Sequence, residues 1–308
     1  MAEFQFRLNP RAGELSTCSA VLNGRGLTYE VNDYRTTLSV KSVVRGSARY
    51  YTPEAQYLVT PDSFLILNEG QRYSLEFEGS AITETLCPFF QAGFLEQAAD
   101  AAALSTGRGL DDPEREPPGT EFCERLYPNS GAVGAALRSI AGRMGGSGAS
   151  ETWLEDRMYE LARALAALHA NVRIEVEDFP GLRRVTRLEL YRRLYRGRDF
   201  LTSCYCQPVS VSAAARAAAL SPFHFQRMFK LAFGKTPMQF LQDTRLNAAR
   251  RLLAHTSDAV TAICFAVGFE SPGSFSWLFR KRFGLSPREF RARTQNRRIE
   301  EVSRAANS

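Results

Sequence analysis

The chain contains an internal repeat, in which one segment recurs 50 residues later. Ser221–Lys230 reads SPFHFQRMFK, and Ser271–Arg280 reads SPGSFSWLFR. The same spacing relates Phe233-Gly234 to Phe283-Gly284, Pro237 to Pro287, and Phe240 to Phe290. A repeat of this kind defines the architecture of the region that contains it. The sequence therefore predicts two copies of one structural unit in the last third of the chain.

Each copy has the local signals of an α-helix. Ser221 and Ser271 are typical N-caps, and each is followed by proline, which is favoured at the first helical position. Gly234 and Gly284 are typical of helix C-caps. A shorter helix is expected before each copy, with Ser210 capping 211–218 and Asp258 capping 259–267. These shorter helices match at a spacing of 49, so the second turn has one extra residue.

A helix, a short turn with a small residue and a second helix form the helix-turn-helix plan. The second helix of this plan lies in the major groove of DNA. Between the two units, a helix is expected from Pro237 to about Ala254. Its ~18 residues span ~27 Å, comparable with the ~34 Å of one DNA turn. We predict that one chain places two recognition helices in successive major grooves.

Charge is unevenly distributed along the chain. Residues 183–308 hold 23 Lys and Arg against 8 Asp and Glu, whereas residues 1–182 hold 16 against 25. A basic part joined to an acidic part indicates a module that binds nucleic acid or a membrane surface. The alternative is that the arginine-rich helices are simply solvated.

The first part of the chain has the pattern of a β-structure. Thr37–Lys41 and Tyr73–Phe77 alternate between apolar and polar residues, and Ser63–Leu67 is a short apolar run. Many short strands with turn residues between them predict a sandwich or barrel over residues 15 to about 90. Residues 104–120 are expected to form a loop.

Two helices follow, at about 132–144 and from an N-cap at Ser150. The second helix has apolar residues spaced 4, 3, 4 and 3 apart, as in coiled-coil pairing. They are Leu154, Met158, Leu161, Leu165 and Leu168. They are candidates for a dimer interface, or alternatively they pack on the chain's own strands. The composition becomes basic after Pro180-Gly181, which we take as a domain boundary.

Residues 188–293 resemble the DNA-binding domain of the AraC/XylS family of transcription regulators. The resemblance rests on Arg193–Leu201, Leu220–Lys230, Arg245–Leu253 and Val267–Ser271. The last motif is followed by Phe275, Phe279, Phe283-Gly284 and Ser286-Pro287. The resemblance implies paired helix-turn-helix units, promoter binding, activation of transcription and contact with RNA polymerase. The first part more weakly resembles the cupin-like jelly-roll barrel and helical dimerisation segment that often precede this domain.

The resemblance also assigns DNA contacts. In the first recognition helix they are Ser221, Phe223, Gln226, Arg227 and Lys230; in the second they are Gly273, Ser274, Ser276, Trp277 and Arg280. Glutamine suits adenine, arginine suits guanine, and an aromatic ring can meet a thymine methyl group. The second set lacks arginine at its base-reading positions and has no asparagine or glutamine. We therefore expect the first unit to supply most of the discrimination. Lys281 and Arg282 are further candidates for phosphate contacts.

Catalytic and metal-binding motifs are not found. The three histidines all lie at or after His169, so a metal-dependent cupin enzyme is not expected, and we assign no metal and no cofactor. Cys204 and Cys206 lack the second cysteine pair that a zinc site requires; they are interpreted as incidental thiols, with redox sensing as the alternative. A metal-free barrel enzyme remains a remote alternative, as does an architectural DNA binder.

Together these features predict an α+β protein that is not an enzyme. Residues 1–180 form an effector-sensing and dimerisation domain, with a β-barrel to about residue 100 and helices at about 132–170. Residues 183–295 form an all-α double helix-turn-helix domain, and 296–308 a polar tail. We expect a cytoplasmic, homodimeric transcription regulator, with no membrane segment, that binds promoter DNA. Its input is either a small molecule or a regulatory protein.

Overall fold

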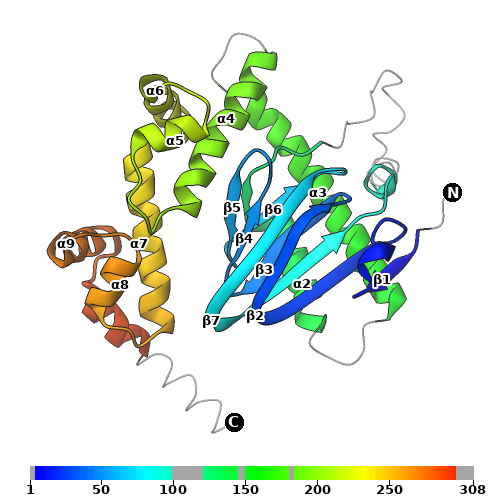
Figure 1. Ribbon diagram of the computed structural model, residues 1–308, viewed down its shortest axis with the longest axis horizontal. Helices are drawn as coiled ribbons and strands as arrows, with labels where there is room; N and C mark the ends of the chain where they lie inside the picture. Colours follow the sequence, from blue (N-terminus) through cyan, green and yellow to red (C-terminus); the bar gives the residue numbers. More distant parts are fainter. Residues whose placement is uncertain (1–3, 99–120, 145–149, 180–183, 296–308) are drawn as a thin grey trace, which may run out of the picture. The chain divides into compact units, whose positions relative to one another are not determined.

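The computed structural model describes residues 4–98, 121–144, 150–179 and 184–295 (Figure 1). The chain forms two compact units, residues 1–199 and 200–308. The predicted loop at 104–120, the boundary at Pro180-Gly181 and the polar tail lie outside the described residues. The division between the two units falls within the residues of one helix, α4 (Arg184–Ser203).

The first unit contains an eight-stranded sheet in the order β1-β2-β7-β3-β6-β8, with β4 paired to β7 and β5 to β4. All pairs are antiparallel except β1 with β2. The strands are β1 (Phe6–Leu8), β2 (Ser19–Arg35), β3 (Ser39–Arg45), β4 (Ala48–Tyr51), β5 (Gln56–Val59), β6 (Ser63–Leu67), β7 (Arg72–Phe89) and β8 (Leu126–Pro128), with a 3-10 turn, η1, at Ala12–Glu14.

Two long strands curl this sheet. β7 pairs with β4 near its start, where Glu76 faces Arg49, and with β3 near its end, where Leu86 faces Ser42. Its partner β2 changes register between Gly26 and Thr28, and such irregularities bend and twist a strand. The result is a nearly closed antiparallel barrel (Figure 1), which confirms the predicted α+β class. β8 was not predicted, because three residues are too few to show alternation.

The barrel interior is filled by side chains. Tyr50 and Tyr57 are at most 1% exposed and pack with Leu65, Leu67 and Leu75. Because large side chains occupy the centre, this interior is a packed core rather than an open chamber.

A lysine is buried in the barrel core. Lys41 on β3 is 1% exposed, and its Nζ lies 3.3 Å from the Tyr73 hydroxyl and 3.9 Å from the centre of the Phe89 ring. Burial disfavours the ammonium form and lowers the pKa of Lys41 to about 8.

Two helices flank the sheet, α2 (Gly131–Met144) and α3 (Glu151–Glu177). The predicted N-cap is confirmed, since the Ser150 hydroxyl accepts a hydrogen bond from the Trp153 backbone N–H at 3.2 Å. α3 continues seven residues beyond the predicted end at about 170 and packs against α2 and β1.

The dimerisation candidates on α3 require a correction. Leu154, Met158, Leu161 and Leu165 are each at most 1% exposed within a single chain, and Leu168 is half-buried. A side chain that is already covered has no surface left to bury in a second copy. This apolar seam is therefore part of the protein's own core, as the alternative interpretation held.

The first part of α4 belongs to the barrel unit. The guanidinium of buried Arg125 lies 4.1 Å from the centre of the Tyr195 ring and 3.3 Å from a carboxylate oxygen of Glu175 on α3. Asp199, also buried, accepts a hydrogen bond from the Leu126 backbone N–H at 2.7 Å. These contacts explain why residues up to 199 group with the barrel unit.

The second unit is helical, with two helix pairs at opposite ends of a longer helix (Figure 1). The pairs are α5 (Val211–Ala217) with α6 (Pro222–Phe233), and α8 (Val260–Ala266) with α9 (Pro272–Phe283); the longer helix is α7 (Pro237–His255). A further helix includes residues 287–295. The predicted cap by Asp258 is wrong: the N-cap of α8 is Ala259, without a side-chain hydrogen bond.

The sequence repeat is also a structural repeat. The ring centres of Phe229 and Phe233 lie 4.5 Å apart, and those of Phe279 and Phe283 lie 4.6 Å apart. The corresponding contacts of Phe229 with Phe240 and of Phe279 with Phe290 are both 5.7 Å. The same aromatic core therefore supports both units. None of the described helices has the length and apolar character of a membrane-spanning segment.

Candidate nucleic-acid interface

The first recognition helix, α6, buries one face and exposes the other. The Ser221 hydroxyl accepts a hydrogen bond from the His224 backbone N–H at 3.3 Å, and Gly234 ends the helix in the left-handed region, with φ of 69°. Phe225 and Phe229 are fully buried, which turns the opposite face outward. The exposed residues on that face are Phe223 (78% exposed), Gln226, Arg227 and Lys230. All four are predicted DNA contacts, whereas the hydroxyl of the fifth, Ser221, caps the helix.

The second recognition helix, α9, has the same construction but a different exposed face. Phe275 and Phe279 are buried, and Gly273, Ser274, Trp277 and Arg280 are exposed. The Trp277 side chain is 62% exposed. Ser276 is half-buried, and its hydroxyl donates a hydrogen bond to the Pro272 carbonyl at 2.8 Å.

The turns that join the paired helices are equivalent in the two units. Ala219 has φ of 50° and Gly268 has φ of 87°. The next backbone N–H in each unit reaches back to the preceding helix, from Leu220 to the Ala215 carbonyl at 2.9 Å and from Phe269 to the Cys264 carbonyl at 3.1 Å. The predicted spacing of 49 is confirmed in these helices. Glu270, which follows Phe269, is the extra residue before the cap at Ser271.

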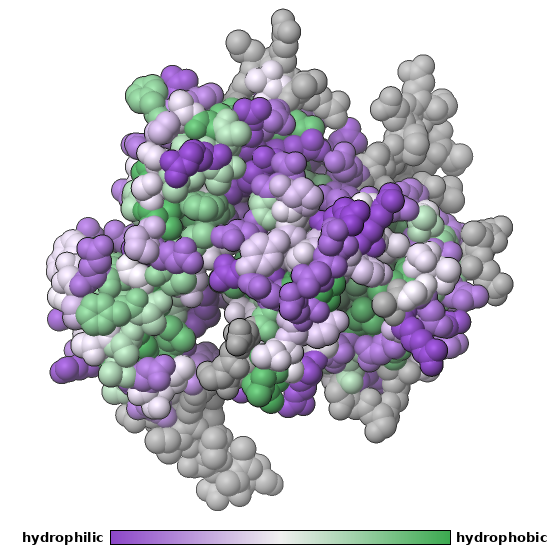
Figure 2. Space-filling model, in the orientation of Figure 1, coloured by the Kyte–Doolittle hydropathy of each residue, from purple (hydrophilic) through white to green (hydrophobic). Residues whose placement is uncertain are grey.

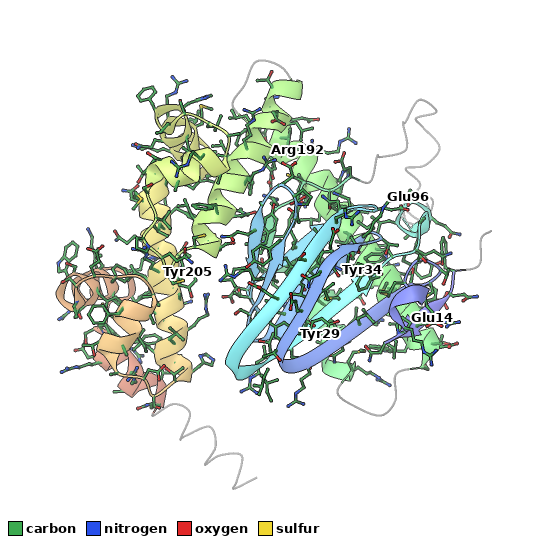
Figure 3. All side chains as sticks on the ribbon, in the orientation of Figure 1. Glu14, Tyr29, Tyr34, Glu96, Arg192 and Tyr205 are labelled. Atoms are coloured by element: carbon green, nitrogen blue, oxygen red, sulfur yellow. The ribbon has the colours of Figure 1, made fainter. Side chains whose placement is uncertain are left out.

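α7 is fastened to the elements on both sides of it. Arg245 donates from Nε to the Tyr205 carbonyl at 2.7 Å and from Nη2 to the Gln207 carbonyl at 2.8 Å; Tyr205 is seen beside α7 in Figure 3. Asp243 accepts a hydrogen bond from Lys235 and lies 3.6 Å from Nε of Arg282 on α9.

The positioning roles of Asp243 and Arg245 were not predicted. Arg245 lies in a motif of the family resemblance, but the sequence does not reveal its backbone partners 38 and 40 residues earlier. Nothing in the sequence pattern singles out Asp243.

The second unit has the charge of a nucleic-acid-binding surface. Residues 200–295 carry 13 Lys and Arg against 4 Asp and Glu. The predicted phosphate contacts Lys230, Arg280, Lys281 and Arg282 are all exposed. Figure 2 shows hydrophobic patches among polar surface over this unit. Cations that meet phosphates beside exposed groups that meet base edges are typical of DNA-binding surfaces.

Other kinds of site have less support. Within the described parts of the chain, no group of three or more His, Cys, Asp or Glu side chains is arranged to hold a metal ion. The first unit has a hollow of about 500 Å³ lined by β-strand residues that include Tyr29, Arg49 and Glu76. A second hollow, of about 310 Å³, is lined by Glu69, Glu96 and neighbouring residues. Figure 3 labels Tyr29 on β2 and Glu96 near one end of the sheet.

Comparisons with known proteins point to the same residues. Residues 214–293 match the family described as a helix-turn-helix domain. The chain is 44% identical over 92 residues, 30% of its length, to the HTH-type transcriptional activator RhaS of Escherichia fergusonii, of which it covers 33%. RhaS of Yersinia pseudotuberculosis serotype I is 28% identical over 212 residues, which are 68% of this chain and 72% of that protein.

The crystal structure of a transcriptional regulator of the AraC-type DNA-binding-domain class from Chromobacterium violaceum is 32% identical. The matched region is 34% of this chain and 93% of the chain in that structure, with a TM-score of 0.33. The chain spans about a third of the length of the first curated relatives. Repeated units, turn geometry and sequence similarity coincide in the same residues: residues 214–293 form a helix-turn-helix domain similar to that of the RhaS transcriptional activators, in agreement with the resemblance to the AraC/XylS family.

Proposed function

We propose that the protein is a sequence-specific DNA-binding transcription regulator that inserts α6 and α9 into successive major grooves. The observation that carries this proposal is the pair of recognition helices, each exposing one face and both in contact with α7, through Phe229 and Phe240 for α6 and through Arg282 and Asp243 for α9. The 19 residues of α7 span about 28 Å at ~1.5 Å per residue. That length is comparable with the ~34 Å repeat of the major groove.

The exposed residues of α6 supply direct readout in this proposal. Gln226 matches the paired donor and acceptor of adenine, and Arg227 matches the two acceptors of guanine. Lys230 and Arg280 contact phosphates, which position the protein without reading sequence.

The test is to select binding sites from random duplex DNA with the full chain and to measure affinity at fixed salt. Gln226→Ala together with Arg227→Ala is expected to remove most of the preference for the selected site, at ~1–3 kcal/mol for each lost bidentate contact. Arg163→Ala, an exposed change on α3, is the control for loss of one positive charge. Equal binding of selected and random DNA by the unaltered protein would overturn the proposal.

The first unit is proposed to receive the signal. Because the barrel core is filled by Tyr50, Tyr57 and their neighbours, the hollow of about 500 Å³ beside Tyr29 and Arg49 is the better candidate for a small-molecule effector. A metabolite that binds there raises the melting temperature of the pure protein and loses this effect in Arg49→Ala. A regulatory protein as input leaves the pure protein unresponsive to metabolites and alters DNA binding only when that protein is added.

Activation and assembly are also proposals. The RhaS relatives are named transcriptional activators, which supports activation through contact with RNA polymerase. Transcription in vitro from a promoter bearing the selected site tests this role. The α3 seam no longer supports the predicted homodimer. The mass of the protein in solution, measured with and without DNA, tests whether a homodimer forms.

A further inference from the structure

The second recognition helix replaces the hydrogen-bonding readers of the first with one aromatic ring. At the spacing of 50, Gln226 corresponds to Ser276 and Arg227 corresponds to Trp277. Both helices expose the same face, because Phe225 and Phe275 are buried at equivalent places. The two helix-turn-helix units therefore present different side-chain types to their half-sites.

The other residues on the face of α9 cannot form the bidentate contacts that Gln226 and Arg227 offer. The Ser276 hydroxyl donates to the Pro272 carbonyl at 2.8 Å, so its hydrogen is already engaged. Gly273 has no side chain that could contact a base. Ser274 is short and lies in the first turn, where its backbone N–H donates to the Ser271 hydroxyl at 3.4 Å.

Trp277 is the large side chain of this face. It is 62% exposed, and the Lys281 Nζ lies 5.0 Å from the centre of its ring. This cation–π contact favours one orientation of the indole and places a positive charge beside it. Trp277 thus presents a large apolar surface at the position where the first helix-turn-helix presents Arg227.

Among the four bases, only thymine carries a methyl group in the major groove. We propose that the second helix-turn-helix reads its half-site through apolar contact between Trp277 and the C5-methyl group of thymine. This inference rests on the proposed function and specifies how α9 takes part in it. The determinant is the methyl group itself, so 5-methylcytosine would satisfy Trp277 as thymine does, whereas uracil and cytosine would not.

The test uses a site selected with the full chain and replaces each thymine of the α9 half-site by uracil. Loss of one buried methyl group is expected to weaken binding about 4-fold at the contacted position. In Trp277→Ala, thymine and uracil are expected to bind equally. Phe223→Ala, which removes the exposed aromatic ring of the other recognition helix, is the matched control and keeps the difference between thymine and uracil in the α9 half-site.

Two further arms test the chemistry. A 5-methylcytosine–guanine pair at the contacted position is expected to bind about 4-fold more tightly than the unmethylated pair. Trp277→Arg, which restores the residue type of the first unit, is expected to shift the preference at that position to guanine.

Equal binding of thymine and uracil by a protein that still prefers its selected site would overturn this inference and leave the proposed function intact. A difference that persists in Trp277→Ala would also overturn it, because another side chain would then read the methyl group. Absence of any preference for selected over random DNA would instead remove the proposed function.

Discussion

At the residue scale, the two helix-turn-helix units have different residues at the same left-handed turn position. The turn after the first helix needs a left-handed residue, which Gly268 supplies in one unit and Ala219 in the other. For an L-residue this conformation costs roughly 1–2 kcal/mol, and alanine, with the smallest side chain, adds little further crowding. The first helix-turn-helix thus has a strained backbone at Ala219, and the second, with Gly268 at the equivalent place, does not.

We predict that Ala219→Gly stabilises the protein. Relief of the left-handed conformation outweighs the ~0.5–1 kcal/mol entropic cost of glycine, for a net gain of about 0.5–1 kcal/mol in the free energy of unfolding. Ala217→Gly, at the last residue of α5, should instead lower it by up to about 1 kcal/mol. Urea unfolding measures both changes, and a loss of stability in Ala219→Gly would contradict the strain argument.

The reverse change, Gly268→Ala, should be costly. A Cβ at residue 268 would lie 2.8 Å from the Tyr205 carbonyl oxygen and 3.0 Å from the Arg245 Nε, so it disturbs the contact that fastens α7. Gly284→Ala is the matched control, since its φ of 78° is similar but nothing lies within 4 Å of the added atom. We expect Gly268→Ala to cost at least about 1 kcal/mol more than the control.

Lys41 makes the stability of the barrel depend on pH. Burial lowers its pKa from 10.5 to about 8. Between these values the unfolded chain binds more protons than the folded one, so stability rises as pH rises through this window. Below pH 8 the penalty of burying the ammonium group is present in full, up to about 3 kcal/mol, because each tenfold change in proton affinity corresponds to about 1.4 kcal/mol.

We therefore predict that Lys41→Met stabilises the protein by about 2 kcal/mol at pH 7, after about 1 kcal/mol is deducted for the hydrogen bond lost by the Tyr73 hydroxyl. The advantage should shrink between pH 8 and pH 10. Lys230→Met, on the exposed face of α6, is the control with no expected effect. Chemical unfolding at several pH values measures the difference, and a gain that is independent of pH would contradict the assigned cause.

At the element scale, helices with local start and stop signals could be predicted closely, and elements that depend on distant contacts could not. Ser221, Gly234 and their repeats define α6 and α9 because capping acts within one turn of the chain. β8 is held by its pairing with β6, more than 60 residues earlier. No local signal shows that Asp199 of α4 bonds to this strand.

The α3 seam, which was a candidate dimer interface, shows a related limit of prediction from sequence. Spacing of 3 and 4 identifies a face that must be buried, but it does not identify what covers that face. The exposed faces of α6 and α9, which we propose read DNA, were predictable because the repeat fixes which positions are core. The bracing contacts of Arg245 and Asp243 were not, since they join segments far apart in the sequence.

The corrected role of the seam leads to a prediction. Leu165→Ala should lower the free energy of unfolding by ~2–5 kcal/mol, as expected for a buried leucine, and leave the mass in solution unchanged. Leu168→Ala, at a half-buried position, should cost less. Thermal unfolding and light scattering measure the two effects. Dissociation of an oligomer without loss of stability would restore the dimer interpretation.

At the scale of the whole molecule, the two helix-turn-helix units act as one reader only if the distance between them is fixed. The contacts of Phe229 with Phe240 and of Asp243 with Arg282 attach α7 to α6 and to α9. A brace of about 28 Å can match one groove repeat but cannot reach the next, which lies a further ~34 Å away. The spacing of the half-sites on DNA therefore tests the architecture directly.

We predict that insertion of five or of ten base pairs between the selected half-sites lowers affinity to that of a single half-site. The loss of one unit's phosphate contacts should also make binding less dependent on salt, by about 0.9 in the logarithmic slope for each lost contact. Insertions outside the two half-sites serve as controls and should change nothing. Recovery of full affinity after insertion of ten base pairs would contradict this architecture. It would mean that the two grooves are read by helices that are not joined through one α7, because a single rigid helix cannot span the extra full turn of the duplex.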